Sequence, residues 1–193
     1  MLRWESVMKA TLRKIEPGDQ AGLLAMYEEF DPKGEFQGLP PRSRETTERW
    51  LAALREAGDG ECVIEVNKRI VGHCLLCLDA SRTEAELAIF VHQDFRGLGL
   101  GRKLLLGALH HGCKVLQLDR VVLSVQGSNP RAVHLFESVG FRPCGAVHGL
   151  QWELEMARLS NCERCKEDRC ILFGQSLPMT VTVAKHKSSC HAN

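Results

Sequence analysis

The sequence predicts an α/β protein with a mixed β-sheet and helices on both faces of the sheet. Segments typical of strands and helices follow one another in the order β-α-α-β-β-β-α-β-α-β-β. Residues 121–125 form a nearly continuous apolar run, which is typical of a buried parallel strand. A glycine-rich turn near residue 96 joins a strand to a helix. Together these features favour a sheet that is covered by helices on both sides.

The first half of the chain contributes a strand, two helices and a hairpin. The predicted elements are a strand over 9–15, helices beginning at Pro17 and running over 43–57, and strands over 61–66 and 70–78. Proline suits the first turn of a helix. The segment 31–42, rich in Pro and Gly, predicts a loop between the two helices, and 67–69 predicts a hairpin turn.

The second half alternates strands with helices and then closes with a hairpin. The predicted elements are strands over 84–92 and 121–125, helices over 99–113 and 129–140, and a hairpin over 141–147 and 150–159. Asn129-Pro130 suits the start of a helix and Gly140 its end. From residue 160 the pattern decays into a polar tail. We therefore expect one domain over 1–159 and a cysteine-containing tail over 160–193.

The composition excludes several classes of protein. The net charge is +1, from 25 basic and 24 acidic side chains, so no global field favours nucleic acid or a membrane surface. No segment has the length of apolar sequence that a membrane-spanning helix needs, and the first residues lack the apolar core of a secretory signal. An odd number of cysteines, nine, argues against a disulfide framework. We expect a cytoplasmic protein in which most cysteines are small buried hydrophobes.

The glycine turn Arg96-Gly97-Leu98-Gly99-Leu100-Gly101 has the features of an anion site. It follows a strand and opens a helix, whose first amides are unpaired and lie at the positive end of the helix dipole. Glycines allow a diphosphate to approach these amides, from Leu98 to Arg102, and Arg96 and Arg102 add positive charge. The spacing fits neither the P-loop nor the dinucleotide-binding fingerprint. The alternative is a turn that only packs a helix on a strand.

Two motifs resemble the GNAT-type acyl-CoA N-acyltransferase superfamily. One is the Arg-Gly-x-Gly-x-Gly turn. The other is the segment 129–141, NPRAVHLFESVGF, which is similar to the superfamily's Asn-x-x-Ala-x-x-Leu-Tyr-x-x-x-Gly-Phe helix. The resemblance covers about residues 9–159. It implies a mostly antiparallel central sheet that splays open between its fourth and fifth strands.

The resemblance also implies where CoA binds. The turn would hold the diphosphate, and the pantetheine arm would enter the splay, where the amide near Val91 would polarise the thioester carbonyl. Asn129 would face the pantetheine or order its loop; the alternative is an ordinary helix cap. The implied acyl-CoA-binding residues are Phe90, Val91, Arg96, Gly97, Leu98, Gly99, Leu100, Gly101, Arg102, Asn129 and Phe136.

Acyl transfer to an amine needs a base, because a lysine amine with a pKa near ~10.4 is protonated at neutral pH. Glu86 is the candidate, since relatives place a catalytic glutamate at a similar point before the turn, and its apolar neighbours would desolvate it. The alternative is a glutamate that faces solvent, and Glu84 is the second choice. Phe136 stands where the superfamily often has a tyrosine that acts as general acid, and His134 is the nearest titratable side chain.

The implied function is transfer of an acetyl group from acetyl-CoA to a primary amine of a small molecule or a protein, by direct attack and without a metal. The alternative is a catalytically weak acyl-CoA-binding sensor or regulatory module, which Phe136 favours. The loop over 30–41 lies where relatives bind the acceptor. We expect no nucleic acid or membrane partner, and a monomer or homodimer.

The tail contains a second candidate site. Its cysteines have a spacing that suits zinc or an iron–sulfur cluster, although the paired knuckles of a zinc ribbon are incomplete. A thiol redox pair and a weakly docked tail without metal are the alternatives. These cysteines are Cys162, Cys165, Cys170 and Cys190.

Overall fold

The computed structural model describes residues 5–34, 39–57, 60–145, 151–157 and 177–184. The first half of the chain forms β1 (Glu5–Lys14), the short 3₁₀ helix η1 (Pro17–Asp19), α1 (Gln20–Glu28), α2 (Arg44–Ala57), β2 (Cys62–Val66) and β3 (Arg69–Leu78). The second half forms β4 (Glu84–Val91), the 3₁₀ helix η2 (Gln93–Phe95), α3 (Leu100–Lys114), β5 (Arg120–Gln126), α4 (Pro130–Val139), β6 (Arg142–Pro143), β7 (Gln151–Ala157) and β8 (Leu177–Ala184).

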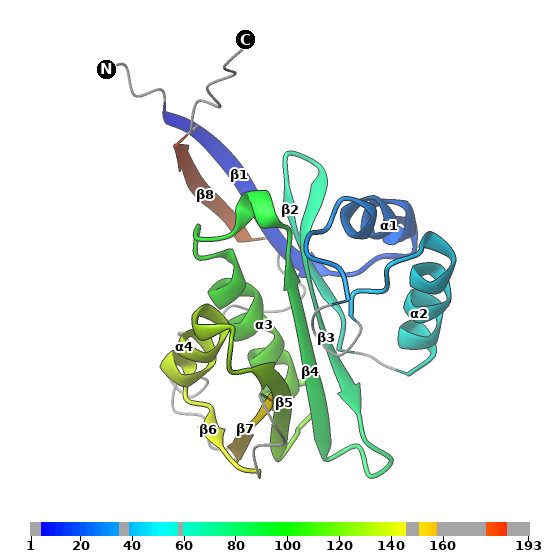
Figure 1. Cartoon of the computed structure of the whole chain (residues 1–193), viewed down its shortest axis with the longest axis vertical. Helices are drawn as coiled ribbons and strands as arrows, with labels where there is room; N and C mark the ends of the chain where they lie inside the picture. Colours follow the sequence, from blue (N-terminus) through cyan, green and yellow to red (C-terminus); the bar gives the residue numbers. More distant parts are fainter. Residues whose placement is uncertain (1–4, 35–38, 58–59, 146–150, 158–176, 185–193) are drawn as a thin grey trace.

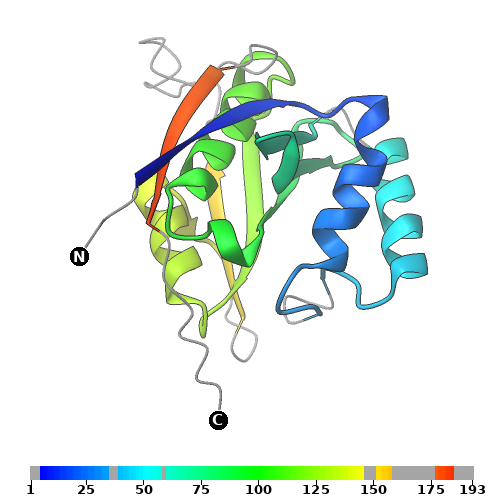
Figure 2. The same ribbon diagram turned by 90° about the horizontal axis from the view of Figure 1, so that it is seen from above.

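The strands form one mixed sheet in the order β6-β7-β5-β4-β3-β2-β1-β8 (Figure 1). Every neighbouring pair is antiparallel except β4 and β5, which are parallel. Seen from above, α1 and α2 lie on one face of the sheet and α3 and α4 on the other (Figure 2). The predicted fold class, a mostly antiparallel mixed sheet between two helical layers, is confirmed.

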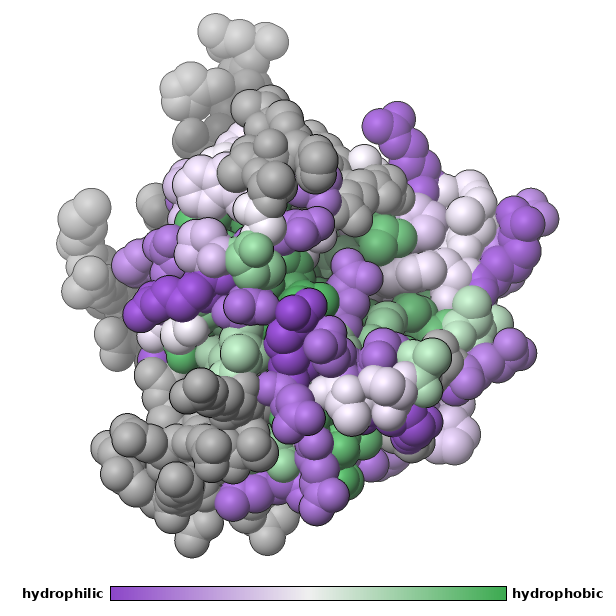
Figure 3. Space-filling view, turned by 90° about the horizontal axis from the view of Figure 1, so that it is seen from below, coloured by the Kyte–Doolittle hydropathy of each residue, from purple (hydrophilic) through white to green (hydrophobic). Residues whose placement is uncertain are grey.

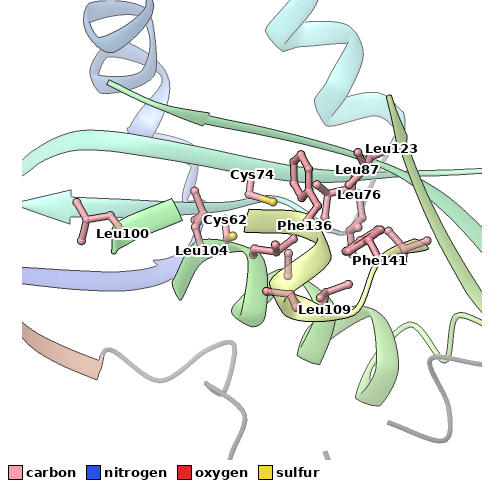
Figure 4. Packing of buried hydrophobic residues seen from close by; sticks show 14 of the residues in the cluster. Cys62, Cys74, Leu76, Leu87, Leu100, Leu104, Leu109, Leu123, Phe136 and Phe141 are labelled. Carbon is pink, nitrogen blue, oxygen red and sulfur yellow. The ribbon is translucent and has the colours of Figure 1, made fainter. Parts of the chain in front are cut away.

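Each face of the sheet packs against its own hydrophobic core. Successive side chains of a strand point to opposite faces, so Leu87 of β4 contributes to the core under α3 and α4, whereas Phe90 contributes to the core under α1 and α2. Phe136 and Phe141 come from α4 and the residues after it, and they lie within the first of these cores (Figure 4). Because both faces are covered, β3 is an almost continuously buried strand.

An ion-pair cluster joins β1, η1 and β2 near the N-terminal end of the domain. Arg13 of β1 lies with its guanidinium 2.6 Å from an oxygen of Asp19 and 2.9 Å from an oxygen of Glu65. The hydrogen bond from Arg13 is the main cause that lowers the pKa of Asp19. This cluster ties η1, and with it the start of α1, to β1 and β2.

The C-terminal segment differs from the prediction. The sequence predicts a polar, cysteine-containing tail over 160–193 and no strand within it, but β8 lies there and pairs antiparallel with β1, from Glu5↔Ala184 to Leu12↔Leu177. Both views show the two strands side by side (Figures 1 and 2). The alternating Thr180-Val181-Thr182-Val183 is a strand signal that the sequence analysis overlooked, whereas the partner strand lies at the opposite end of the chain and no local pattern reveals it. The four tail cysteines lie outside the described residues.

The five cysteines that the structure describes are unpaired, and most of them are buried, as predicted. Cys62, Cys74 and Cys113 are buried free thiols, Cys77 is half-buried and Cys144 is exposed. Seen from below, hydrophobic residues occur in small groups between hydrophilic ones (Figure 3). In the part of the chain that the structure describes, no helix is long and apolar enough to cross a bilayer.

Candidate functional site

The sheet opens between β4 and β5. Their parallel pairing comprises three register pairs, the last of which joins Glu86 to Val122. β4 nevertheless continues to Val91 and β5 to Gln126. The predicted splay between the fourth and fifth strands is therefore present, and it begins directly after Glu86.

The edge of β4 that faces this opening carries backbone groups that β5 does not reach. On its other edge, β4 pairs with β3, and the amide of His92 donates to the carbonyl of Val71 at 2.9 Å. Backbone groups of successive strand residues point to opposite edges. Since those of His92 and Phe90 point toward β3, those of Ile89 and Val91 face the opening. Of the two residues predicted to pair with pantetheine, Val91 thus presents its backbone there and Phe90 does not.

The glycine turn after β4 contains two residues in the left-handed conformation. Gly97 has φ +78° and Gly99 has φ +75°. A Cβ added at either position meets no atom within 4 Å, so conformation and not space requires glycine there. At Gly101 a Cβ would lie 3.5 Å from Leu135 and 3.7 Å from Val91, which is ordinary packing distance. The first two glycines therefore shape the turn, and the third lies at a helix contact.

The turn delivers the uncapped N-terminus of α3. Gly99 is the N-cap residue and has no side chain that could bond the first amides of this 15-residue helix, which begins at Leu100. Such amides, with the positive end of the helix dipole, favour a bound anion. The Leu100 side chain is buried and Leu98 packs against the core. Leu100 can therefore meet a ligand only through its backbone, whereas Arg102 is exposed and donates to Ser138 Oγ at 2.9 Å.

Arg96 links the glycine turn to the residues that follow α1. Its Nε donates to the carbonyl of Val91 and its Nη2 to the carbonyl of Asp31, each at 2.9 Å. Its guanidinium carbon lies 5.1 Å from the ring centroid of Phe30. Burial is the main cause that lowers the pKa of Arg96. The sequence predicted a charge beside the diphosphate, and the structure adds a bridge between β4 and the end of α1.

Glu86 lies at the start of the opening with an exposed side chain. Of its apolar neighbours in sequence, Leu87 and Ile89 face the opposite side of the sheet. Ala88 and Phe90 share its face and pack into the core under α1 and α2, but they leave Glu86 exposed. Among the described residues, no side chain forms a hydrogen bond or ion pair with its carboxylate. Cys77 lies opposite it in register on β3. Burial, followed by the charge of Glu86, raises the pKa of the Cys77 thiol to about 11.

Glu84 lies on the same face of β4 but is already paired. Its carboxylate oxygen is 3.1 Å from Nε of Arg120, whose Nη1 is 3.3 Å from Glu155 on β7. The two candidates therefore differ, and Glu86 is the one available to an incoming molecule.

The residues of the second motif have structural roles. The side chain of Asn129 accepts a hydrogen bond from the amide of Ala132 at 3.2 Å and so caps α4, with Pro130 in the first turn. Phe136 is 5% exposed and its ring packs against that of Phe141. His134 is exposed. Phe136 itself offers no proton donor at the position where relatives often have tyrosine.

A buried polar chain on the α1 side was not predicted. The hydroxyl of Tyr27 lies 2.7 Å from Nδ1 of His73, and Nε2 of His73 lies 2.7 Å from the carboxylate of Glu61. Burial raises the pKa of Tyr27. The Tyr27 ring meets those of Phe90 and Trp50 edge to face. Three residues from α1, β3 and the start of β2 meet here only through the fold, and no local motif marks them.

Comparisons with known proteins agree with this geometry. The model of the acetyltransferase (GNAT) family matches residues 23–141. The spermidine N(1)-acetyltransferase of Vibrio cholerae serotype O1 is 32% identical over 134 residues, which cover 68% of this chain and 78% of that protein. The L-amino acid N-acyltransferase MnaT of Escherichia coli K12 is 31% identical over 129 residues, which cover 62% and 74%.

Solved structures share the fold. The acetyltransferase of GNAT family from Streptococcus pneumoniae superposes with a TM-score of 0.64 at 23% identity, over 77% of this chain and 98% of that one. The spermidine N-acetyltransferase from Vibrio cholerae in complex with CoA and spermine gives 0.62 at 23% identity, over 77% and 95%. The family match includes both motifs and the opening between β4 and β5, and the chain therefore belongs to the acetyltransferase (GNAT) family of acyl-CoA-dependent N-acyltransferases.

Proposed function

We propose that this chain transfers an acetyl group from acetyl-CoA to a primary amine. One observation carries the proposal: the backbone edge of β4, open from Glu86 to Val91, leads within a few residues into the left-handed glycines and the uncapped end of α3. Acetyl-CoA is an extended molecule with a thioester at one end of its pantetheine arm and a diphosphate at the other. The protein offers matching groups in the same order.

The backbone would make most of the contacts with acetyl-CoA. Amides from Leu98 to Arg102 face the diphosphate, and the exposed Arg102 adds a positive charge. The amide groups of the pantetheine arm pair with the open edge of β4 at Ile89 and Val91. The N–H of Val91 donates to the thioester carbonyl and stabilises the negative charge that develops on this oxygen during attack.

Glu86 is the proposed general base. The amine nitrogen forms a bond to the carbonyl carbon, the carbon–sulfur bond breaks, and CoA leaves as a thiolate while the amine proton passes to the Glu86 carboxylate. The exposure of Glu86 and its position at the start of the opening support this role. Because Phe136 cannot donate a proton, the thiolate takes its proton from solvent.

The test is thiol release from acetyl-CoA with a panel of amines. The panel contains spermidine and L-amino acids, which the names of the relatives suggest, together with lysine peptides. We expect Glu86→Gln to lower kcat by roughly 10²- to 10⁴-fold. Its affinity for CoA should stay within about twofold of that of the parent, since the carboxylate does not hold the diphosphate. Glu84→Gln is the matched control on the same strand face, and normal turnover of Glu86→Gln would remove Glu86 from the mechanism.

Phe136 favours a second candidate, a CoA-binding regulatory module with little turnover. The buried phenylalanine leaves this helix position without the hydroxyl that relatives often use. The same assay separates the two functions. Binding of CoA without thiol release from any amine in the panel would support the regulatory module.

We further propose that the acetyltransferase domain proper spans residues 1–159, to whose sheet the C-terminal segment adds β8 as an edge strand, that catalysis needs no metal ion, and that the protein is cytoplasmic. An odd number of cysteines, nine, most of them in predicted strands and helices, supports the last point. Within the ranges that the structure describes, no group of three His, Cys, Asp or Glu side chains could hold a metal. Full activity after treatment with a chelator would support the second point.

The proposed assembly is a monomer or homodimer. A spermidine N-acetyltransferase from Vibrio cholerae has been solved as a dodecamer, so a larger assembly is the alternative. Light scattering on the full chain, and on a chain that ends at residue 159 and lacks β8, measures the oligomeric state and the contribution of the C-terminal segment.

A further inference from the structure

The side chain of Gln93, in the connection after β4, forms two hydrogen bonds with the end of α1 and the residues that follow it. The carboxamide of Gln93 donates from Nε2 to the carbonyl of Glu29 at 2.7 Å and accepts at Oε1 from the amide of Asp31 at 3.0 Å. Only one orientation of the carboxamide satisfies both bonds. Glu29 is the C-cap of α1, where a helix leaves its last carbonyls without partners in the helix. Gln93 therefore holds the point at which the chain leaves α1.

Neighbouring contacts also hold residues 29–31, which form the end of α1 and its exit. The carbonyl of Asp31 accepts from Arg96, so both backbone groups of Asp31 are bound by the segment between β4 and α3. The ring of Phe30 lies under the Arg96 guanidinium and 6.0 Å from the ring of Phe90. The carboxylate of Glu29 accepts from Arg69 of β3 at 2.7 Å.

We propose that Gln93 is a positioning residue that couples CoA binding at the glycine turn to the segment 29–31 at the end of α1. The inference rests on the proposed function. Gln93 lies four residues before Gly97, and Arg96 lies directly before it. When a diphosphate fixes the turn, the same backbone carries Gln93 and Arg96, and through them it fixes residues 29–31. Coupling between two binding events is reciprocal, so an acceptor that contacts residues 29–31 also tightens CoA binding.

Glutamine is suited to this role because its carboxamide can bond both a backbone acceptor, the carbonyl of Glu29, and a backbone donor two residues later, the amide of Asp31. Glutamate at this position keeps an acceptor for Asp31 but places a negative oxygen against the Glu29 carbonyl. Alanine removes both bonds. Asp94 is the next residue and is exposed, and none of the hydrogen bonds to Glu29 or Asp31 involves its side chain. Asp94→Asn is therefore a matched control that keeps the shape of the segment.

Hydrogen–deuterium exchange of the full chain with and without CoA tests the coupling. In the parent and in Asp94→Asn, we expect saturating CoA to slow amide exchange in the peptide 27–34 by at least about fivefold. In Gln93→Ala and Gln93→Glu this slowing should be lost. Calorimetric titration with CoA should nevertheless give a Kd within roughly threefold of the parent value, since the turn itself is intact. A contact with only a structural role would change exchange equally with and without CoA.

Two outcomes overturn the proposal, and they are distinguishable. If CoA binds but exchange in the peptide 27–34 does not respond to it in the parent, or responds equally in the Gln93 variants, the coupling is wrong and the proposed function stands. If calorimetry detects no CoA binding to the parent, the proposed function fails and the coupling fails with it.

Discussion

Replacing Gly99 and Gly101 by alanine, one at a time, distinguishes a glycine required by its backbone conformation from one that only lies at a packing contact. Gly99 has φ +75°, which costs a residue with a Cβ about 1–2 kcal/mol. Gly101 has no positive φ, and its Cβ would meet Leu135 and Val91 at ordinary distances. In the first turn of α3, alanine there should be neutral or stabilise the fold by up to about 1 kcal/mol through helix propensity.

The conformational cost of Gly99→Ala can lower either the stability of the free protein or its affinity for CoA. If the free protein keeps the left-handed turn, the free energy of unfolding of Gly99→Ala falls by about 1–2 kcal/mol. If the turn relaxes instead, CoA must restore it, and the Kd for CoA rises by about 5- to 30-fold, since 1.4 kcal/mol corresponds to a factor of ten. Urea unfolding and calorimetric titration with CoA measure the two parts. Their sum should reach at least about 1 kcal/mol for Gly99→Ala and stay near zero for Gly101→Ala. Equal sums for the two variants would refute this assignment of the turn.

Two further perturbations address the α1 side of the sheet. Tyr27→Phe removes the hydroxyl that bonds His73 and leaves a fully buried imidazole nitrogen without that partner. The free energy of unfolding in urea should therefore fall by about 1–3 kcal/mol. An unchanged value would show that the buried hydrogen bonds of Tyr27, His73 and Glu61 contribute nothing to stability. The raised pKa of Cys77, about 11, leaves its thiol protonated at neutral pH, so alkylation should accelerate as pH rises toward that value. In Glu86→Gln the loss of a nearby negative charge should lower the pKa of Cys77 and move this acceleration to lower pH, and an unmoved profile would contradict the closeness of the two side chains.

Local sequence carries most of the information about which elements form. The apolar run after residue 120, the Asn129-Pro130 start of α4 and the glycine at its end each specify backbone conformation within a few residues, and the structure has the elements there. The alternation of Thr and Val in β8 is a local strand signal that the sequence analysis overlooked, but the place of this strand at the edge of the sheet depends on its partner. Its pairing with β1 joins residues at opposite ends of the chain, and no pattern within eight residues encodes that contact.

The candidate site divides in the same way. The turn could be predicted because glycine spacing, strand and helix are contiguous, and the left-handed angles at Gly97 and Gly99 agree with that pattern. The exposure of Glu86 could not be predicted from its apolar neighbours. Alternation along β4 sends Leu87 and Ile89 to the other face, and the neighbours on its own face pack into the core without covering it. The split role of Phe90, with its backbone toward β3 and its ring in the aromatic cluster, also required the register.

The sequence by itself determined that this chain has the two motifs of an acyl-CoA site and the order of elements that places them around one sheet. Only the tertiary structure decided which side chains meet across that sheet. Gln93 and Arg96 bind the end of α1, and Tyr27 reaches His73, over separations of more than forty residues. The physical reason is that hydrogen bonds of this kind depend on distances of about 3 Å, which strand register and helix packing set and which neighbouring residues in the chain do not.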